Sequence, residues 1–198
     1  MEAQPFLKPR QRGVLHQQAF YVSLISGALL LTAASTVRSF VAAAIFAVSV
    51  SALLGVSALY HRGDWTHSVR MKLRRLDHSM IFLLIAGTYT PFCLLTMSGT
   101  WATAILVAVW SAAAIGIVIE LVWTGSPKWV SALIYVAVGW IGALAFPSIV
   151  GSAGVAAGLL IATGGLLYTV GAVVYATGRP NPSPTYFEAM TLAAFLHF

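Results

Sequence analysis

Long apolar stretches, separated by short polar connections, make up most of the 198-residue chain. A helix crosses a bilayer with about 17–25 such residues, because each residue adds about 1.5 Å. Six stretches meet this length, at 19–35, 37–60, 77–97, 101–123, 129–149 and 154–176. A seventh stretch begins near Tyr186 and reaches Phe198, which is too short to cross by itself.

These stretches predict an all-α integral membrane protein. Lipid offers exposed backbone groups no partner, so spanning structures are helices or closed barrels, and the stretches lack the alternation of a barrel strand. Only 8% of the residues are charged and 59% are hydrophobic, whereas a soluble domain carries about 25% charged residues. We expect a seven-transmembrane-helix bundle with helix 7 truncated or incomplete. Residues 1–18 would be a cytoplasmic segment and 19–198 one bundle domain.

The basic residues predict how the bundle is oriented. Ten of the eleven Lys and Arg residues fall on one side of the predicted membrane, and Arg38 alone falls on the other. Cytoplasmic loops carry an excess of Lys and Arg, so we expect a cytoplasmic N-terminus in a bacterial plasma membrane. The net charge of +6 is then explained by topology and by attraction to anionic headgroups. Membrane lipids, and not nucleic acid, are the expected partners.

The most informative polar residues lie at the ends of the second and third stretches. Ser57 and His61 are four residues apart, so a helix places them on one face. After a basic loop, Asp77 and His78 open the third stretch on the same side of the membrane. Histidine and carboxylate suit zinc as ligands or as partners of ligands. Ionisable groups in such places are usually functional.

Three other residues with reactive side chains are predicted to have structural roles. His16 precedes the first stretch and Glu120 lies near the cytoplasmic end of the fourth, so both are predicted to lie at the membrane interface. Cys93 is the only cysteine, which excludes an intramolecular disulfide, and it is predicted to pack within the third stretch.

Ordered motifs cover most of the chain. They read KPRQRGVLH at 8–16, SALYHR at 57–62, RRLDH at 74–78, AGTYTPF at 86–92 and YATGRPNP at 175–182. In this order they resemble the bacterial hemolysin III family, which is related to the adiponectin and progestin receptors of the PAQR superfamily.

The resemblance implies a zinc site on the cytoplasmic side of the bundle. In that superfamily one histidine comes from helix 2 and two come from a His-x-x-x-His motif that opens helix 7, while an acid beginning helix 3 supports a bound water. Carried over, His61 is the expected zinc ligand, Ser57 its motif partner and Asp77 the acidic group, the last two with catalytic roles. No His-x-x-x-His motif follows residue 182.

Two residues near the C-terminus bear on the missing ligands. Glu188 is either a replacement ligand or the acid that remains after a deletion of the motif, and the sequence leaves both open. His197 lies ten residues beyond Phe187, or about 15 Å along a helix. That distance reaches the bilayer midplane, so a structural role is expected for His197.

Three functions remain in competition. The first is a zinc-dependent hydrolase of a lipid amide or ester, in which Asp77 orients a zinc-bound water. The second is a receptor-like or membrane-homeostasis protein that binds a lipid or fatty acid without turnover. The third is the pore-forming, cytolytic activity that the family name carries. It has the least physical support, because six apolar helices cannot stay soluble for release and no row of ionisable residues could line a channel.

Overall fold

The computed structural model describes residues 13–123 and 127–177, and all regular structure in these ranges is helical. The helices are α1 (Val14–Ala33), α2 (Val37–Arg62), α3 (His67–Pro91), α4 (Gly99–Val122), α5 (Lys128–Trp140) and α6 (Phe146–Thr177). A π-helical turn, η1 (Phe92–Thr96), extends α3, and a 3-10 turn, η2 (Ile141–Ala145), joins α5 to α6. The predicted all-α fold is confirmed for this part of the chain. The predicted seventh stretch lies outside the described residues.

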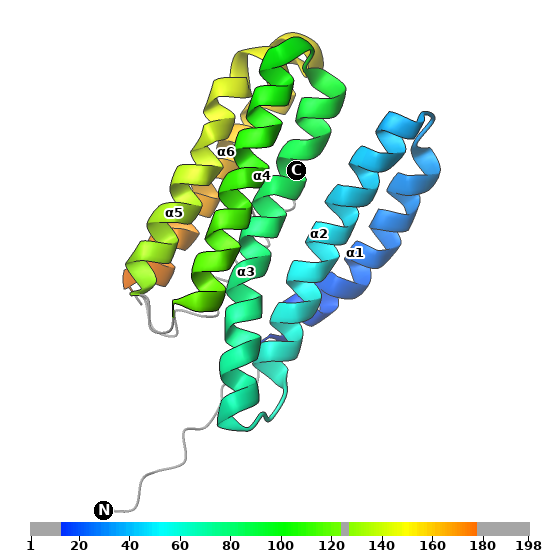
Figure 1. Ribbon diagram of the computed structural model, residues 1–198. Helices are drawn as coiled ribbons and strands as arrows, with labels where there is room; N and C mark the ends of the chain where they lie inside the picture. The colour runs from blue at the N-terminus through cyan, green and yellow to red at the C-terminus, as the bar shows by residue number, and fades with distance from the viewer. Residues whose placement is uncertain (1–12, 124–126, 178–198) are drawn as a thin grey trace, which may run out of the picture.

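Five described stretches are long and apolar enough to cross a membrane. The fifth, Trp129–Thr177, has 49 residues, and Gly154 interrupts its helical backbone with φ at 88°. The chain folds back there: a Cβ atom on Gly158 would lie 2.6 Å from Val150, and α5 and α6 run side by side in Figure 1. The predicted stretches 129–149 and 154–176 are therefore the two arms of one helical hairpin. The protein is a multi-pass membrane protein.

Helix α3 begins earlier than predicted, at His67 rather than Asp77. The segment interpreted as a basic loop is therefore mostly helical, and its first turns carry Arg70, Lys72, Arg74 and Arg75. Lys and Arg are good helix formers, so the helix continues beyond its apolar part, whereas the hydropathy pattern marks only the apolar part. Asp77 lies about three turns into α3.

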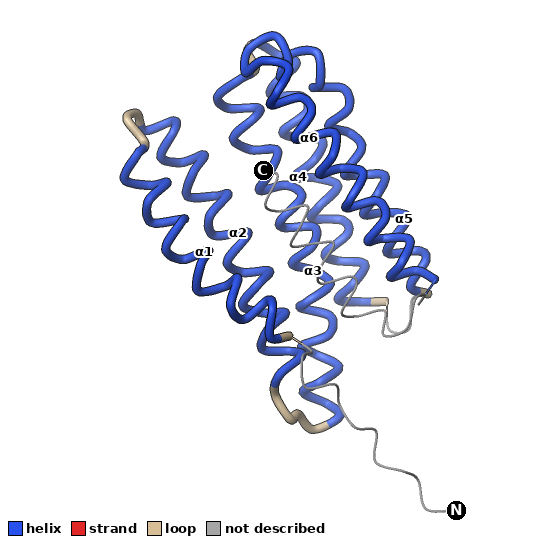
Figure 2. Tube along the Cα trace, turned by 180° about the vertical axis from the view of Figure 1, so that it is seen from behind, coloured by secondary structure: helices blue, strands red, loops and turns tan. Residues whose placement is uncertain are grey.

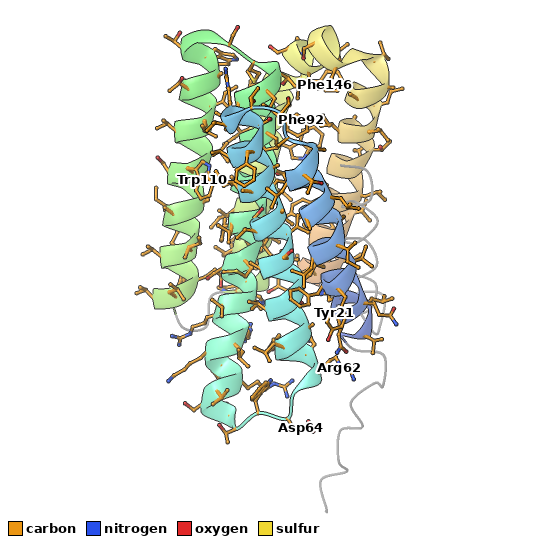
Figure 3. All side chains as sticks on the ribbon, turned by 90° about the vertical axis from the view of Figure 1, so that its right-hand side faces the viewer. Tyr21, Arg62, Asp64, Phe92, Trp110 and Phe146 are labelled. Atoms are coloured by element: carbon orange, nitrogen blue, oxygen red, sulfur yellow. The ribbon has the colours of Figure 1, made fainter. Side chains whose placement is uncertain are left out.

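The helices form two groups that share α3. Helices α1 and α2 form a hairpin, and α2 packs against α3 (Figures 1 and 2). Helix α3 also packs against α4, and α5 packs against α6. One end of the bundle carries Arg62 and the four basic residues of α3; we call it the basic end. Figure 3 shows Arg62 and Asp64 there, with Phe92 and Phe146 at the opposite end.

A glycine allows close packing between α3 and α4. Phe82 of α3 is 1% exposed and belongs to the main hydrophobic core. A Cβ atom on Gly116 of α4 would lie 2.4 Å from the Phe82 ring, so no larger residue fits while the ring keeps its place. Small residues at helix contacts are typical of membrane bundles, where close packing drives association.

Candidate functional site

A buried hydrogen bond joins α1 to the basic end of α2. The Nδ1 atom of His16 lies 2.7 Å from the Oγ atom of Ser57, and the two residues are only 2% and 4% exposed. His16 is thus buried against α2 rather than exposed on the bundle surface, whereas its position at the membrane interface stays a prediction. Helix α1 begins at Val14, before the apolar stretch, so His16 lies within the helix and faces α2.

Gly13 allows the start of α1 to approach the end of α2 this closely. Its φ of 77° lies in the left-handed region, which side-chain-bearing residues avoid. A Cβ atom on Gly13 would lie 2.7 Å from the Cβ of His61 and 3.2 Å from the Cγ of Arg62. Backbone angle and space both require glycine here, and His61 therefore lies beside the start of α1.

Asp77 of α3 adds a third helix to the contact between His16 of α1 and Ser57 of α2. The Ser57 hydroxyl interacts with the Asp77 carboxylate as well as with His16. Ser57 thus lies where α1, α2 and α3 meet, at the basic end. The expectation that Ser57 and Asp77 reach the same depth from neighbouring helices agrees with this placement. Their catalytic roles stay predictions.

His61 lies one helical turn beyond Ser57, and its ring packs against Tyr60 with the centroids 4.6 Å apart. Within residues 13–123 and 127–177, no three His, Cys, Asp or Glu side chains lie close enough together to hold a metal ion. A catalytic zinc takes three protein ligands, so the described donors alone do not fit zinc. Glu188 and His197 lie outside the described residues.

A second buried polar cluster is centred on His78, the residue that follows Asp77 in α3. The Nδ1 atom of His78 is 3.5 Å from Oε2 of Glu120, and its Nε2 atom is 3.3 Å from the hydroxyl of Tyr175. The side chains of His78 and Glu120 are 13% and 6% exposed. Oε1 of Glu120 accepts hydrogen bonds from the hydroxyls of Ser131 and Tyr135. The cluster joins four helices, α3 to α6.

Glu120 is therefore paired inside the bundle rather than turned toward the headgroups, whereas its position near the membrane interface stays a prediction. Burying an unpaired carboxylate costs free energy, so an acid inside an apolar stretch is expected to have a buried partner. Glu120 lies in such a stretch, and this position is the sequence signal for its pairing. The sequence does not reveal that partner, because the rotation of each helix decides which side chains meet. In the sequence, His78 stands out only as the neighbour of Asp77, and Tyr175 only as part of a family motif.

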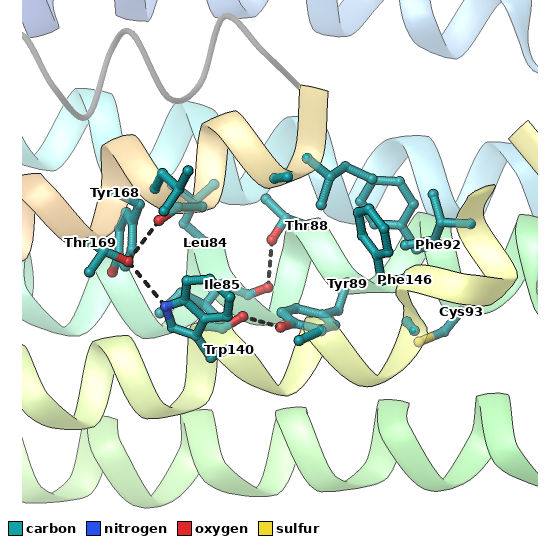
Figure 4. A pocket seen from close by; sticks show the side chains of 18 residues that line it. Leu84, Ile85, Thr88, Tyr89, Phe92, Cys93, Trp140, Phe146, Tyr168 and Thr169 are labelled. Carbon is teal, nitrogen blue, oxygen red and sulfur yellow. Dashed lines mark hydrogen bonds between the residues drawn. The ribbon is translucent and has the colours of Figure 1, made fainter. Parts of the chain in front are cut away.

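An apolar cavity of about 410 Å³ lies between α3, α5, η2 and α6 (Figure 4). Its wall includes Leu84, Ile85, Phe92, Phe146, Ile161 and Leu166, and buried Cys93 also lines it. The polar groups of the wall mostly bond within the protein. Trp140 donates to the hydroxyl of Thr169 at 3.1 Å, and Tyr89 donates to the backbone carbonyl of Gly139. The cavity therefore presents a largely apolar surface.

Comparison with known proteins agrees with the family resemblance of the sequence motifs. A family model described as "Haemolysin-III related" matches residues 5–190. The chain is 38% identical to a "Hemolysin-3 homolog" of Bacillus subtilis (strain 168), over 62% of this chain and 61% of that protein. It is 36% identical to "Hemolysin-3" of Bacillus cereus, over 71% of this chain and 64% of that protein. The matched region thus spans less than two thirds of these relatives, and no solved structure matches. The chain belongs to the hemolysin III family.

Proposed function

We propose that this protein binds a fatty acid or a lipid acyl chain in the cavity between α3, α5 and α6, and acts as a receptor-like or membrane-homeostasis protein. The cavity carries this proposal. Ligand pockets in proteins typically measure about 300–1,000 Å³ and are mostly apolar with a few polar groups. The volume of about 410 Å³ and the lining residues fit that description.

The chemistry of the wall favours an acyl chain over a polar ligand. Thr88, Tyr89 and Trp140 use their donors on protein acceptors. A polar ligand would leave its own groups unpaired in this cavity, which costs free energy. The hydroxyl of Tyr168, which also lines the cavity, is buried and has no hydrogen-bond partner among the described residues. It is therefore a wall group that could pair with a polar atom of a ligand.

The proposal includes the predicted topology of seven helices with a cytoplasmic N-terminus. Arg38 begins α2 and the five basic residues of the basic end lie at the other end of the bundle. Arg75 donates to the backbone carbonyl of Leu121 at 3.1 Å, which brings the end of α4 to the basic end as well. Such an excess of Lys and Arg supports assigning the basic end to the cytoplasm.

Fluorescence quenching by 9,10-dibromostearic acid tests the binding proposal. Trp140 lines the cavity, whereas Trp101 on α4 does not and is similarly exposed. The chain has six tryptophans, so two variants in nanodiscs would each retain one of these and carry Phe elsewhere. We expect saturable quenching of Trp140 at low fatty acid, and quenching of Trp101 only in proportion to the bulk content of the bilayer. Equal quenching of both would overturn the proposal.

A second candidate is zinc-dependent hydrolysis of a lipid amide or ester. The meeting of Ser57 with Asp77 and His16, one turn from His61, favours it. His61 would be a zinc ligand, Asp77 and Ser57 would act beside it, and further ligands would come from residues outside the described ranges. Metal analysis of the purified protein decides whether it binds zinc. We expect stoichiometric zinc that is lost in His61→Ala and kept in His67→Ala, where an exposed histidine is removed. Absence of zinc from the parent protein would eliminate this candidate.

A further inference from the structure

Two consecutive residues of α3 connect the two helix groups. Successive residues of an α-helix are rotated by about 100°, so Asp77 and His78 point toward different neighbours. Asp77 interacts with Ser57 of α2. His78 lies against Glu120 of α4 and Tyr175 of α6. A rotation of α3 would disturb both sets of contacts together.

The contacts of His78 fix this part of α3 from several directions. Its ring meets the ring of Tyr175 edge-on, with the planes at 89° and the centroids 5.6 Å apart. The hydroxyl of Tyr135 is 3.1 Å from the backbone oxygen of His78 and 3.3 Å from Oε1 of Glu120. Backbone and side chain of one residue are thus held by α4, α5 and α6.

Both carboxylate oxygens of Glu120 have partners, which restricts its position in turn. Ser131 and Tyr135 donate to Oε1, and His78 faces Oε2. In low-polarity surroundings such a network resists disruption, because each group left without its partner carries a large desolvation cost. The network is therefore well suited to hold α3 at one rotation.

We propose that His78 and Glu120 are a positioning pair that fixes the rotation of α3 and thereby holds Asp77 against Ser57. The pair acts through Asp77 and need not touch a ligand. The proposal rests on the geometry of the basic end and is independent of whether a lipid binds in the cavity or zinc binds near His61.

Carbon-13 NMR of the Asp carboxyl groups tests this directly, in full-length protein without added ligand in nanodiscs. The chain contains two aspartates, Asp64 and Asp77, so [4-¹³C]aspartate labelling gives two resonances, and Asp64→Asn assigns them. Glu120→Gln disturbs the network from one side. His78→Phe disturbs it from the other, keeping a ring against Tyr175 while removing both nitrogens.

A matched control breaks another hydrogen bond between the same two helices. Trp110 of α4 donates to the hydroxyl of Thr90 of α3 at 3.1 Å, away from the basic end. Thr90 itself donates to the carbonyl of Ala86, so Trp110→Phe leaves its donor satisfied. We expect this variant to keep both Asp resonances at their parent positions.

The expected result is a resolved shift of the Asp77 resonance in Glu120→Gln and in His78→Phe, with the Asp64 resonance unchanged. An unshifted Asp77 resonance in Glu120→Gln would overturn the proposal, whatever His78→Phe shows, because His78 also acts electrostatically on the neighbouring Asp77 carboxyl group. If both variants fail to assemble while Trp110→Phe assembles, the pair is an element of folding rather than of positioning, and the proposal is equally overturned.

Discussion

His16 and Ser57 share a buried hydrogen bond of 2.7 Å across 41 residues of sequence. The bond joins the first turn of α1 to the last two turns of α2. Ser57 also interacts with Asp77, so one hydroxyl connects α1, α2 and α3. The position of Asp77 at the basic end therefore depends on contacts made by the very start of α1.

Removing either side chain should destabilise the protein by about 1–3 kcal/mol, because a buried polar partner loses its hydrogen bond. We expect His16→Ala plus Ser57→Ala to cost less than the sum of the single variants, since residues in one network couple. Reversible unfolding in mixed detergent micelles measures this. Ser26→Ala removes an exposed hydroxyl that bonds only within α1, and should have little effect. Strict additivity of the pair would contradict the prediction.

Gly13→Ala should destabilise the bundle more than Gly99→Ala. Both glycines have φ in the left-handed region, 77° and 74°, where another residue costs about 1–2 kcal/mol. Only Gly13 faces a second obstacle, because its new Cβ would meet His61 at 2.7 Å, whereas nothing lies within 4 Å at Gly99. Unfolding free energies of the two variants test the difference, and equal losses would show that α1 shifts freely.

Gly116→Ala should loosen the contact of α4 with α3, because its Cβ would lie 2.4 Å from the Phe82 ring. Shortening that ring should restore part of the loss, so we expect Gly116→Ala with Phe82→Leu to be more stable than Gly116→Ala alone. The same unfolding assay measures this. Phe82→Leu by itself should be destabilising, since it removes buried volume from the core. Absence of rescue would mean that another contact limits the approach of the helices.

Gly165→Leu should weaken fatty acid binding by filling the cavity from within. Gly165 lines the cavity, and a Cβ atom there has nothing within 4 Å, so the larger side chain has room. Gly151→Leu is the matched control, since Gly151 is equally unobstructed and is not part of the cavity wall. Quenching of Trp140 by 9,10-dibromostearic acid should lose its saturable component only in Gly165→Leu. A binding curve unchanged from the parent would place the ligand elsewhere.

The contact of Ser57 with Asp77 could be anticipated because each residue ends or opens a long apolar stretch. Charged residues at a membrane boundary fix the depth of the helix that carries them. Two neighbouring antiparallel helices then bring such residues to the same depth in the membrane. The same hydropathy signal predicts a loop for the basic segment between them, and that prediction is wrong. Hydropathy locates the bilayer boundary, but α3 passes through it and begins at His67.

The contact of His78 with Glu120 could not be anticipated in the same way. An apolar helix gives no sequence periodicity from which to tell its protein-facing side, because both lipid and protein accept apolar residues. The rotation of α4 decides whether Glu120 faces lipid or α3, and that rotation depends on contacts such as Gly116 with Phe82. The burial of His16 is not predictable in this way either, because α1 approaches α2 closely at Gly13, whose backbone angle is not evident from sequence.

The turn at Gly154 is made without a charged connection. No charged residue occurs from Trp129 to Thr177, so no polar loop separates the two arms. The reversal depends on one backbone angle that glycine adopts readily. The two arms therefore form one uncharged helical hairpin, in which a glycine, and not a polar loop, makes the turn.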